Sequence, residues 1–113
     1  MGYRSDVRIS TNKADYQKFV EYVGNIKGLI SDNGPEFYDE DEDSVIFGWD
    51  QVKWYEEYDD VSTVMNALDE LSGECCFEYI RVGDDDDDIE HRVYGNWWNL
   101  ERHLGTETRI VWW

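Results

Sequence analysis

The acidic residues of this chain are concentrated in its middle, and this limits where a core can form. Residues 36–90 hold 21 Asp and Glu against only Lys53 and Arg81, whereas residues 1–35 and 91–113 each have a net charge of +1. Charged side chains avoid the interior of a protein, so a fold has to place this middle segment's acids in turns and on outer faces. The core then depends on the apolar residues between the acids. They are 41% of the 113 residues and include six Trp, enough for one domain spanning 1–113.

Apolar periodicity predicts that both helices and strands fill the space between the acidic runs. Helical spacing of apolar residues predicts helices near 12–27 and 60–72. Alternating or continuous apolar runs predict strands at 3–10, 36–40, 44–55, 75–82, 89–94 and 109–113. The first six elements follow the βαββαβ order of ferredoxin-like domains. We therefore expect an α+β fold in which two helices cover one face of an antiparallel sheet, with extra strands at the C-terminal end.

Three groups of acids form the candidate partner-binding surface. The first group is Glu36, Asp39, Glu40, Asp41, Glu42 and Asp43, and the second is Asp84, Asp85, Asp86, Asp87, Asp88 and Glu90. Glu56 and Glu57 belong to a third, looser group that also contains Asp50, Asp59 and Asp60. Solvated loops that keep a protein soluble are the simple interpretation. The alternative is a surface that docks on a basic, nucleic-acid-binding protein.

Mimicry of nucleic acid is a specific form of that alternative. Alternate side chains on one face of a strand lie about 6.6 Å apart, so Asp39, Asp41 and Asp43 have a spacing similar to that of phosphates. A net charge of −17 disfavours nucleic acid itself, or an anionic membrane, as a direct partner.

The sequence patterns for metal binding and for catalysis are weaker than the acidic pattern. Asp84, Asp86, Asp88 and Glu90 alternate like calcium ligands, but they lack the central Gly and the length of an EF-hand loop. Cys75, Cys76, His91 and His103 lack the paired spacing of zinc ligands. We expect no metal, no cofactor and no catalytic residue, and therefore a protein that is not an enzyme.

The tryptophans divide into core candidates and surface candidates. Trp49 and Trp54 are predicted to lie in the core or at its rim. The adjacent pairs Trp97-Trp98 and Trp112-Trp113 are candidate aromatic anchors, because Trp is enriched at binding hot spots. Packing over the edge of the sheet is the simpler alternative for both pairs. A rival function follows from them: a structural or assembly protein that forms a homo-oligomer through its sheet edge or its Trp-rich tail.

The expected compartment is the cytoplasm. The first residues contain no apolar signal region, and the longest apolar runs are far shorter than the roughly 20 residues of a membrane span. The neighbouring Cys75 and Cys76 are poorly placed to pair with each other, so we expect reduced thiols.

Two short segments carry a resemblance. The opening Met-Gly-Tyr-Arg-Ser-Asp-Val, and Phe77–Gly83 followed by acids, resemble small acidic proteins encoded by phages and prophages. The resemblance covers about 15 residues. It implies a host cytoplasm as the setting and, by analogy with anti-CRISPR and anti-restriction proteins, an inhibitor of a nucleic-acid-binding host protein. It transfers no catalytic residue.

Crowding of the acids predicts a pH dependence. If folding brings unpaired carboxylates together, their pKa values rise above the unfolded values, and stability increases as the pH falls from about 7 to about 5.

Overall fold

A computed structural model describes residues 4–24, 30, 34–84, 88–100, 102–106 and 110–112. The helices are α1 (Lys13–Val23) and α2 (Asp59–Leu71), and a short 3₁₀ turn, η2, covers Trp97–Asn99. The strands are β1 (Ser5–Asn12), β2 (Phe37–Glu40), β3 (Ser44–Val52), β4 (Phe77–Gly83), β5 (Ile89–Tyr94), β6 (Leu104–Thr106) and β7 (Ile110–Trp112).

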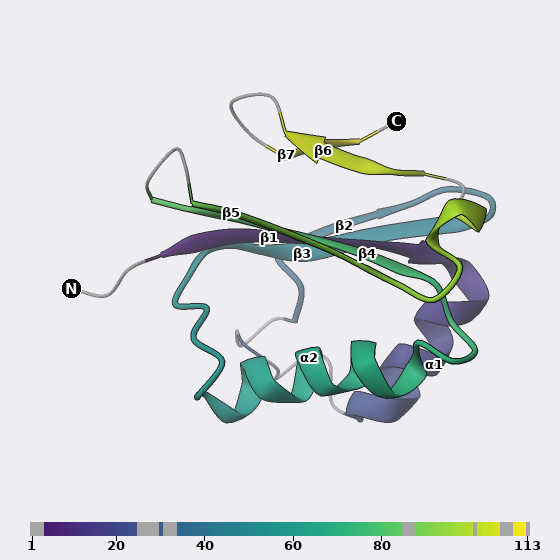
Figure 1. Cartoon of the computed structure of the whole chain (residues 1–113), viewed down its shortest axis with the longest axis horizontal. Coiled ribbons are helices and arrows are strands. Elements are labelled where there is room, and N and C mark those ends of the chain that lie inside the picture. Colours follow the sequence, from purple (N-terminus) through teal and green to yellow (C-terminus); the bar gives the residue numbers. More distant parts are fainter. Residues whose placement is uncertain are drawn as a thin grey trace.

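The main sheet has five antiparallel strands in the order β2-β3-β1-β4-β5. Its first four strands have the order of a ferredoxin-like βαββαβ unit, and β5 extends that unit by one strand. Both helices lie on one face of the sheet, and the small β6-β7 ribbon lies over the opposite face (Figure 1). The predicted α+β class and the two helices on one face are therefore confirmed.

Each helix follows from its local sequence. The apolar stripe of α2 is buried against the sheet, and Asp59 and Asp60 occupy its first turn, where the helix dipole favours negative charge. The helix α1 ends at Val23, four residues before the predicted end. Gly24 adopts a φ of 83°, which terminates the helix, and its N–H donates to the carbonyl of Val20.

Two apolar cores lie on the two faces of the sheet. The larger one, between the sheet and the helices, contains Trp49 and Trp54, as predicted. The smaller one lies under the β6-β7 ribbon and contains Ile46, Ile80, Leu104 and Ile110, with the partly buried Trp112 beside them. The strand β6 was not predicted, because its three residues, Leu-Gly-Thr, have no periodicity to recognise.

Polar groups fasten the ribbon to the sheet. Arg102 donates to Ser44 Oγ and to Asp39 Oδ2, both at 2.7 Å, and to the carbonyl of Asp39 at 2.9 Å. The buried carboxylate of Glu78 accepts the backbone N–H of Leu104 at 2.7 Å and lies 2.7 Å from Nε2 of His91. These contacts determine which acids remain available at the surface.

Candidate binding surface

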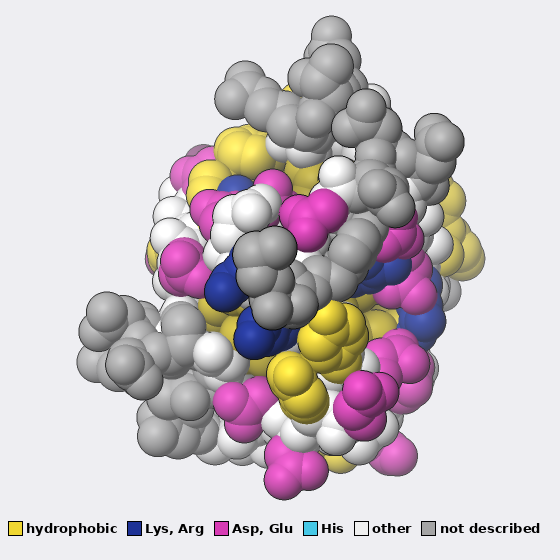
Figure 2. Space-filling view, turned by 90° about the vertical axis from the view of Figure 1, so that its left-hand side faces the viewer, with side chains coloured by type: hydrophobic (Ala, Val, Ile, Leu, Met, Phe, Trp, Pro, Cys, Tyr) yellow, Lys and Arg dark blue, Asp and Glu magenta, His cyan; other side chains and the backbone are white. Residues whose placement is uncertain are grey.

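An open pocket of about 1010 Å³ lies at the end of the main sheet, where β3 ends and α2 begins. Five acids line it, together with two bases: Glu36, Asp50, Glu57, Asp59, Asp60, Arg4 and Lys53. Figure 2 faces this end and shows Asp and Glu side chains spread around a few cations and an apolar patch. The pocket gathers acids from three separate parts of the sequence.

The backbone at the end of β3 shapes this pocket. Gln51 adopts a left-handed φ of 52°, which a non-glycine residue adopts only when its surroundings hold it there. Asp6 accepts hydrogen bonds from the backbone N–H of Gln51 at 2.8 Å and from its Nε2 at 3.1 Å. Arg4 donates from Nη1 to the carbonyl of Gln51 at 2.9 Å. The pairing of β1 with β3 shifts at this point and resumes with Ser5 opposite Val52, the last residue of β3.

Two of the five pocket acids have partners. Asp50 forms an ion pair with Arg8 at 2.8 Å, and Asp60 accepts the backbone N–H of Ile30 at 3.0 Å. Glu36, Glu57 and Asp59 are exposed and form no ion pair with any residue that the structure describes. These three carboxylates are the ones available to a ligand.

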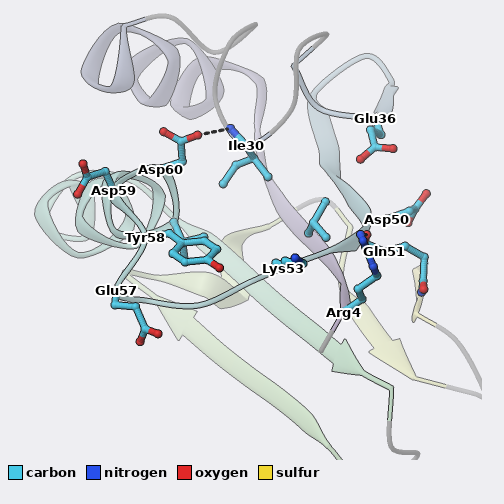
Figure 3. A pocket seen from close by; sticks show the side chains of 12 residues that line it. Arg4, Ile30, Glu36, Asp50, Gln51, Lys53, Glu57, Tyr58, Asp59 and Asp60 are labelled. Atoms are coloured by element: carbon cyan, nitrogen blue, oxygen red, sulfur yellow. Dashed lines mark hydrogen bonds between the residues drawn. The ribbon is translucent and has the colours of Figure 1, made fainter. Parts of the chain in front are cut away.

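Tyr58 adds an aromatic wall. Its side chain is 44% exposed, and in Figure 3 it extends from the start of α2 toward Lys53 and Ile30. Its ring packs edge-on against Tyr55, with centroids 5.3 Å apart. Sequence reasoning did not select Tyr58, although its position between Glu57 and Asp59 was a usable signal.

The first acidic group is largely occupied by structural contacts. Arg102 contacts Asp39 at 2.7 Å and Asp41 at 3.5 Å, and Lys13 contacts Glu40 at 2.8 Å. Glu42 and Asp43 are exposed and make no ion pair within the described part of the chain. Only Glu36 of this group lies in the pocket.

The second group is also partly occupied. Asp88 forms a two-pronged pair with Arg81 at 2.9 and 3.1 Å, and Asp84 accepts the backbone N–H of Arg4 at 3.1 Å. Glu90 accepts from the hydroxyl of Tyr79 at 2.9 Å and from Arg92 at 2.6 Å. Arg92 also contacts Glu56, at 3.4 Å. Asp85, Asp86 and Asp87 lie outside the described residues.

The two acidic groups do not form one surface. The β2–β3 turn lies near the pair Asn12–Ser44, whereas the β4–β5 turn lies next to Ser5–Gly83. These are the two ends of β1, whose residues rise about 3.3 Å each, so the turns are separated by about 23 Å. Glu36 of the first group is an exception, because it lies in the pocket at the other end of β3.

The candidate anchors Trp97 and Trp98 lie away from the pocket. Trp98 is 65% exposed and Trp97 is partly exposed, and both follow the C-terminal end of β5, at the opposite end of the sheet. Trp112 packs edge-on against Phe37, with centroids 5.0 Å apart, which is the packing alternative. Trp113 lies outside the described residues.

Hydrogen bonds, some of them from bases, reverse the expected pKa shifts of three acids. Hydrogen bonds from Lys13 and Tyr38 lower the pKa of Glu40, and the backbone N–H of Asp43 is the main cause of the lowered pKa of Asp41. Burial alone raises the pKa of Glu90, but Tyr79 and Arg92 outweigh it, so the net direction is downward. The expected increase in pKa was wrong for these groups, because backbone and tyrosine donors, together with Lys13 and Arg92, hydrogen-bond to the charged carboxylates.

We therefore expect acid to destabilise the protein through these groups. A folded pKa below the unfolded value gives stability that is present above the unfolded pKa of about 4 and is lost as the pH falls through the folded pKa. The three groups contribute no gain between pH 7 and 5. Melting temperatures at about pH 7, 5 and 3 test this, and we expect a clear decrease only at the last. A melting temperature that rises on acidification would mean that repulsion between acids outweighs their pairing.

The two cysteines carry protonated thiols. Burial, with Asp15 nearby, raises the pKa of Cys75 to about 11, and burial also raises that of Cys76. Both are therefore poor nucleophiles at neutral pH.

Among the described residues there is no cluster of three or more His, Cys, Asp or Glu arranged to hold a metal ion. No helix in the described ranges has the length and apolar character needed to cross a membrane.

Comparisons with protein families, with curated proteins and with solved structures found no match to this chain. The assignment of a function therefore depends on the chemistry of the surface.

Proposed function

We propose that this chain is a non-enzymatic binding protein whose acidic pocket docks on a basic surface of a partner protein. The observation that carries the proposal is the pocket itself, in which five acids surround a concave space and the carboxylates of three of them form neither an ion pair nor a hydrogen bond with a described residue. Lys and Arg side chains of a partner fit such a space, because a concave acidic surface concentrates cations.

Tyr58 supplies the second component of a binding site. Charged rims steer a partner into place, whereas buried aromatic residues provide most of the affinity. The exposed ring of Tyr58 lies among the pocket acids and can stack on a guanidinium group that enters from the partner.

A nucleic-acid-binding protein is the partner class that fits best. Surfaces that bind phosphates are rich in Lys and Arg. The resemblance to phage-encoded proteins agrees with a host protein of this class and with an inhibitory role. Because bases of the chain itself already pair with Asp39, Glu40, Asp88 and Glu90 of the two acidic runs, we propose local docking at the pocket rather than mimicry of an extended nucleic-acid backbone.

Two triple variants with the same change in charge test the proposal. The pocket variant is Glu36→Gln, Glu57→Gln and Asp59→Asn. The helix variant is Glu21→Gln, Glu70→Gln and Asp69→Asn, which lie on exposed parts of α1 and α2 outside the pocket lining. Each variant removes three negative charges, so a difference between them reports position and not net charge.

Immobilised wild-type protein and both variants are used to capture proteins from host lysate. We expect a basic protein that the wild type and the helix variant retain, that the pocket variant loses, and that added DNA displaces. Equal capture by all three proteins, or equal loss from both variants, would contradict docking at the pocket.

A further inference from the structure

The strand β5 forms an open edge of the main sheet and carries exposed apolar side chains. Among the strands that the structure describes, it pairs with β4 and with no other. Ile89 is 47% exposed and Val93 is 43% exposed, and both lie on the sheet face that carries the β6-β7 ribbon. Long edge strands with apolar side chains favour pairing with another strand. The opposite edge strand, β2, has only four residues.

The hydrogen-bond pattern shows which backbone groups of β5 face outward. The N–H of Gly83 donates to the carbonyl of Asp88 at 2.8 Å, so these two residues form a hydrogen-bonded pair. Such pairs alternate along an antiparallel ladder. Glu90, Arg92 and Tyr94 therefore direct their N–H and C=O groups toward β4, while those of Ile89, His91 and Val93 point to the free edge.

This alternation limits how β5 can pair with a second β5 about a two-fold axis. The outward-facing residues are Ile89, His91 and Val93, and each of them has to pair with an outward-facing residue of the second copy. Such residues are separated by two positions, so the two-fold axis passes through a residue and not between two neighbours. An axis at Glu90 opposes two Glu90 side chains, and an axis at Arg92 opposes two Arg92 side chains; both arrangements repel.

An axis at His91 places the two His91 side chains opposite each other, each beside the Glu78 carboxylate of its own copy, and the pairs on either side are complementary. Ile89 then faces the Val93 of the second copy, and Glu90 faces its Arg92. Apolar pairs lie on one face of the joined sheet and ion pairs on the other. The segment Ile89-Glu90-His91-Arg92-Val93 is thus self-complementary about its central residue.

We propose that two copies of this chain associate through β5, antiparallel and with the two-fold axis at His91, to form a ten-stranded sheet. The five strands of each copy supply that number. We take the partner at this edge to be a second copy of the chain, because the order Ile-Glu-His-Arg-Val is complementary to itself when the two strands run antiparallel. This edge is separate from the acidic pocket, so either proposal can fail while the other holds.

The net charge of each copy makes us expect that added salt strengthens the dimer. Each copy carries −17, so two copies repel at long range, while the pairs at the edge attract at short range. The Debye length falls from about 10 Å at 0.1 M salt to about 3 Å at 1 M, which screens the long-range repulsion more than the contacts. We expect the dimer to become about tenfold tighter over this range, whereas docking of the acidic pocket on a basic partner weakens.

A charge swap tests the register. Glu90→Arg alone places arginines opposite Arg92, and Arg92→Glu alone places glutamates opposite Glu90, so neither variant is expected to dimerise. An equimolar mixture restores two attractive pairs in a heterodimer. Sedimentation velocity at 1 M salt is expected to show a dimer for the wild type and for the mixture, and monomers for each variant alone.

Amide hydrogen exchange of the wild type provides a second measurement that does not depend on the folding of the variants. The amides of His91 and Val93 are expected to gain protection as protein concentration increases, while those of Glu90 and Arg92, already bonded to β4, stay unchanged. A wild type that stays monomeric at 1 M salt, or that dimerises without this alternating protection, would overturn the proposal. So would a mixture that remains monomeric while both variants are folded.

Discussion

Gly48→Ala is expected to destabilise the protein by about 3 kcal/mol or more, enough to unfold a large fraction of a domain of this size. Gly48 lies in β3, between β1 and β2. A Cβ atom there would lie 1.8 Å from the carbonyl oxygen of Val7 and 2.8 Å from its carbonyl carbon. Backbone atoms in the middle of a sheet cannot move away without breaking the ladder.

The register explains why this position has no side chain. Gly48 pairs with Arg8 on one side and with Phe37 on the other. The guanidinium of Arg8 crosses over β3 and lies 4.2 Å from the ring centroid of Phe37, where a cation–π contact forms. A methyl group at Gly48 would obstruct the β1 backbone from which Arg8 extends.

Gly73→Ala is the matched control. A Cβ atom at Gly73 has no heavy atom within 4 Å, and its φ is not left-handed. We expect a change within about 0.5 kcal/mol for this exposed site. Urea denaturation followed by tryptophan fluorescence measures both variants. Similar urea midpoints for Gly48→Ala and Gly73→Ala would contradict the close approach of β3 to the β1 backbone.

Arg102→Ala is expected to cost about 2–3 kcal/mol, because the largely buried guanidinium and its charge-assisted hydrogen bonds to Asp39 and Ser44 are lost. The side chain of Arg102 is 13% exposed and contacts Asp39, Asp41 and Ser44. Its loss leaves the carboxylate of Asp39 without its cation and weakens the attachment of the β6-β7 ribbon, which covers the smaller apolar core.

Arg92→Ala is the control for this second variant. Arg92 also contacts two carboxylates, those of Glu90 and Glu56, but its side chain is 41% exposed. Exposed ion pairs contribute about 0–1 kcal/mol, so we expect a small effect. Denaturation midpoints for the two variants are compared under the same conditions. Equal losses would mean that the ribbon does not depend on Arg102.

The sequence predicted the elements whose signals are local. The apolar stripe of α2, the hairpin of β2 with β3, and the core positions of Trp49 and Trp54 all follow from periodicity within a few residues. The helix α1 ends early because a single glycine with positive φ outweighs the apolar spacing beyond it.

The charge pattern gave a wrong expectation for acids whose basic partners are distant in the sequence. Counting acids and bases within residues 36–90 assumed that the flanking bases stay away from them. Arg102 instead reaches Asp39 and Asp41, and Lys13 reaches Glu40. Only tertiary structure decides these contacts. It also brings Glu36 into one pocket with the consecutive residues Glu57, Tyr58 and Asp59, which are distant from it in the sequence.

The rate of association between this chain and its captured partner decides whether the pocket is the docking surface. Stopped-flow or surface-based kinetics at salt concentrations from about 0.1 M to 1 M are compared for the wild type, the pocket variant and the helix variant. We expect the pocket variant to associate about tenfold more slowly than the wild type at low salt, and this difference to vanish at high salt, because steering depends on unscreened charge near the contact. The helix variant is expected to stay within about twofold of the wild type. Equal rates for the two variants at every salt concentration would contradict docking at the pocket and leave the acidity as a general property of the surface.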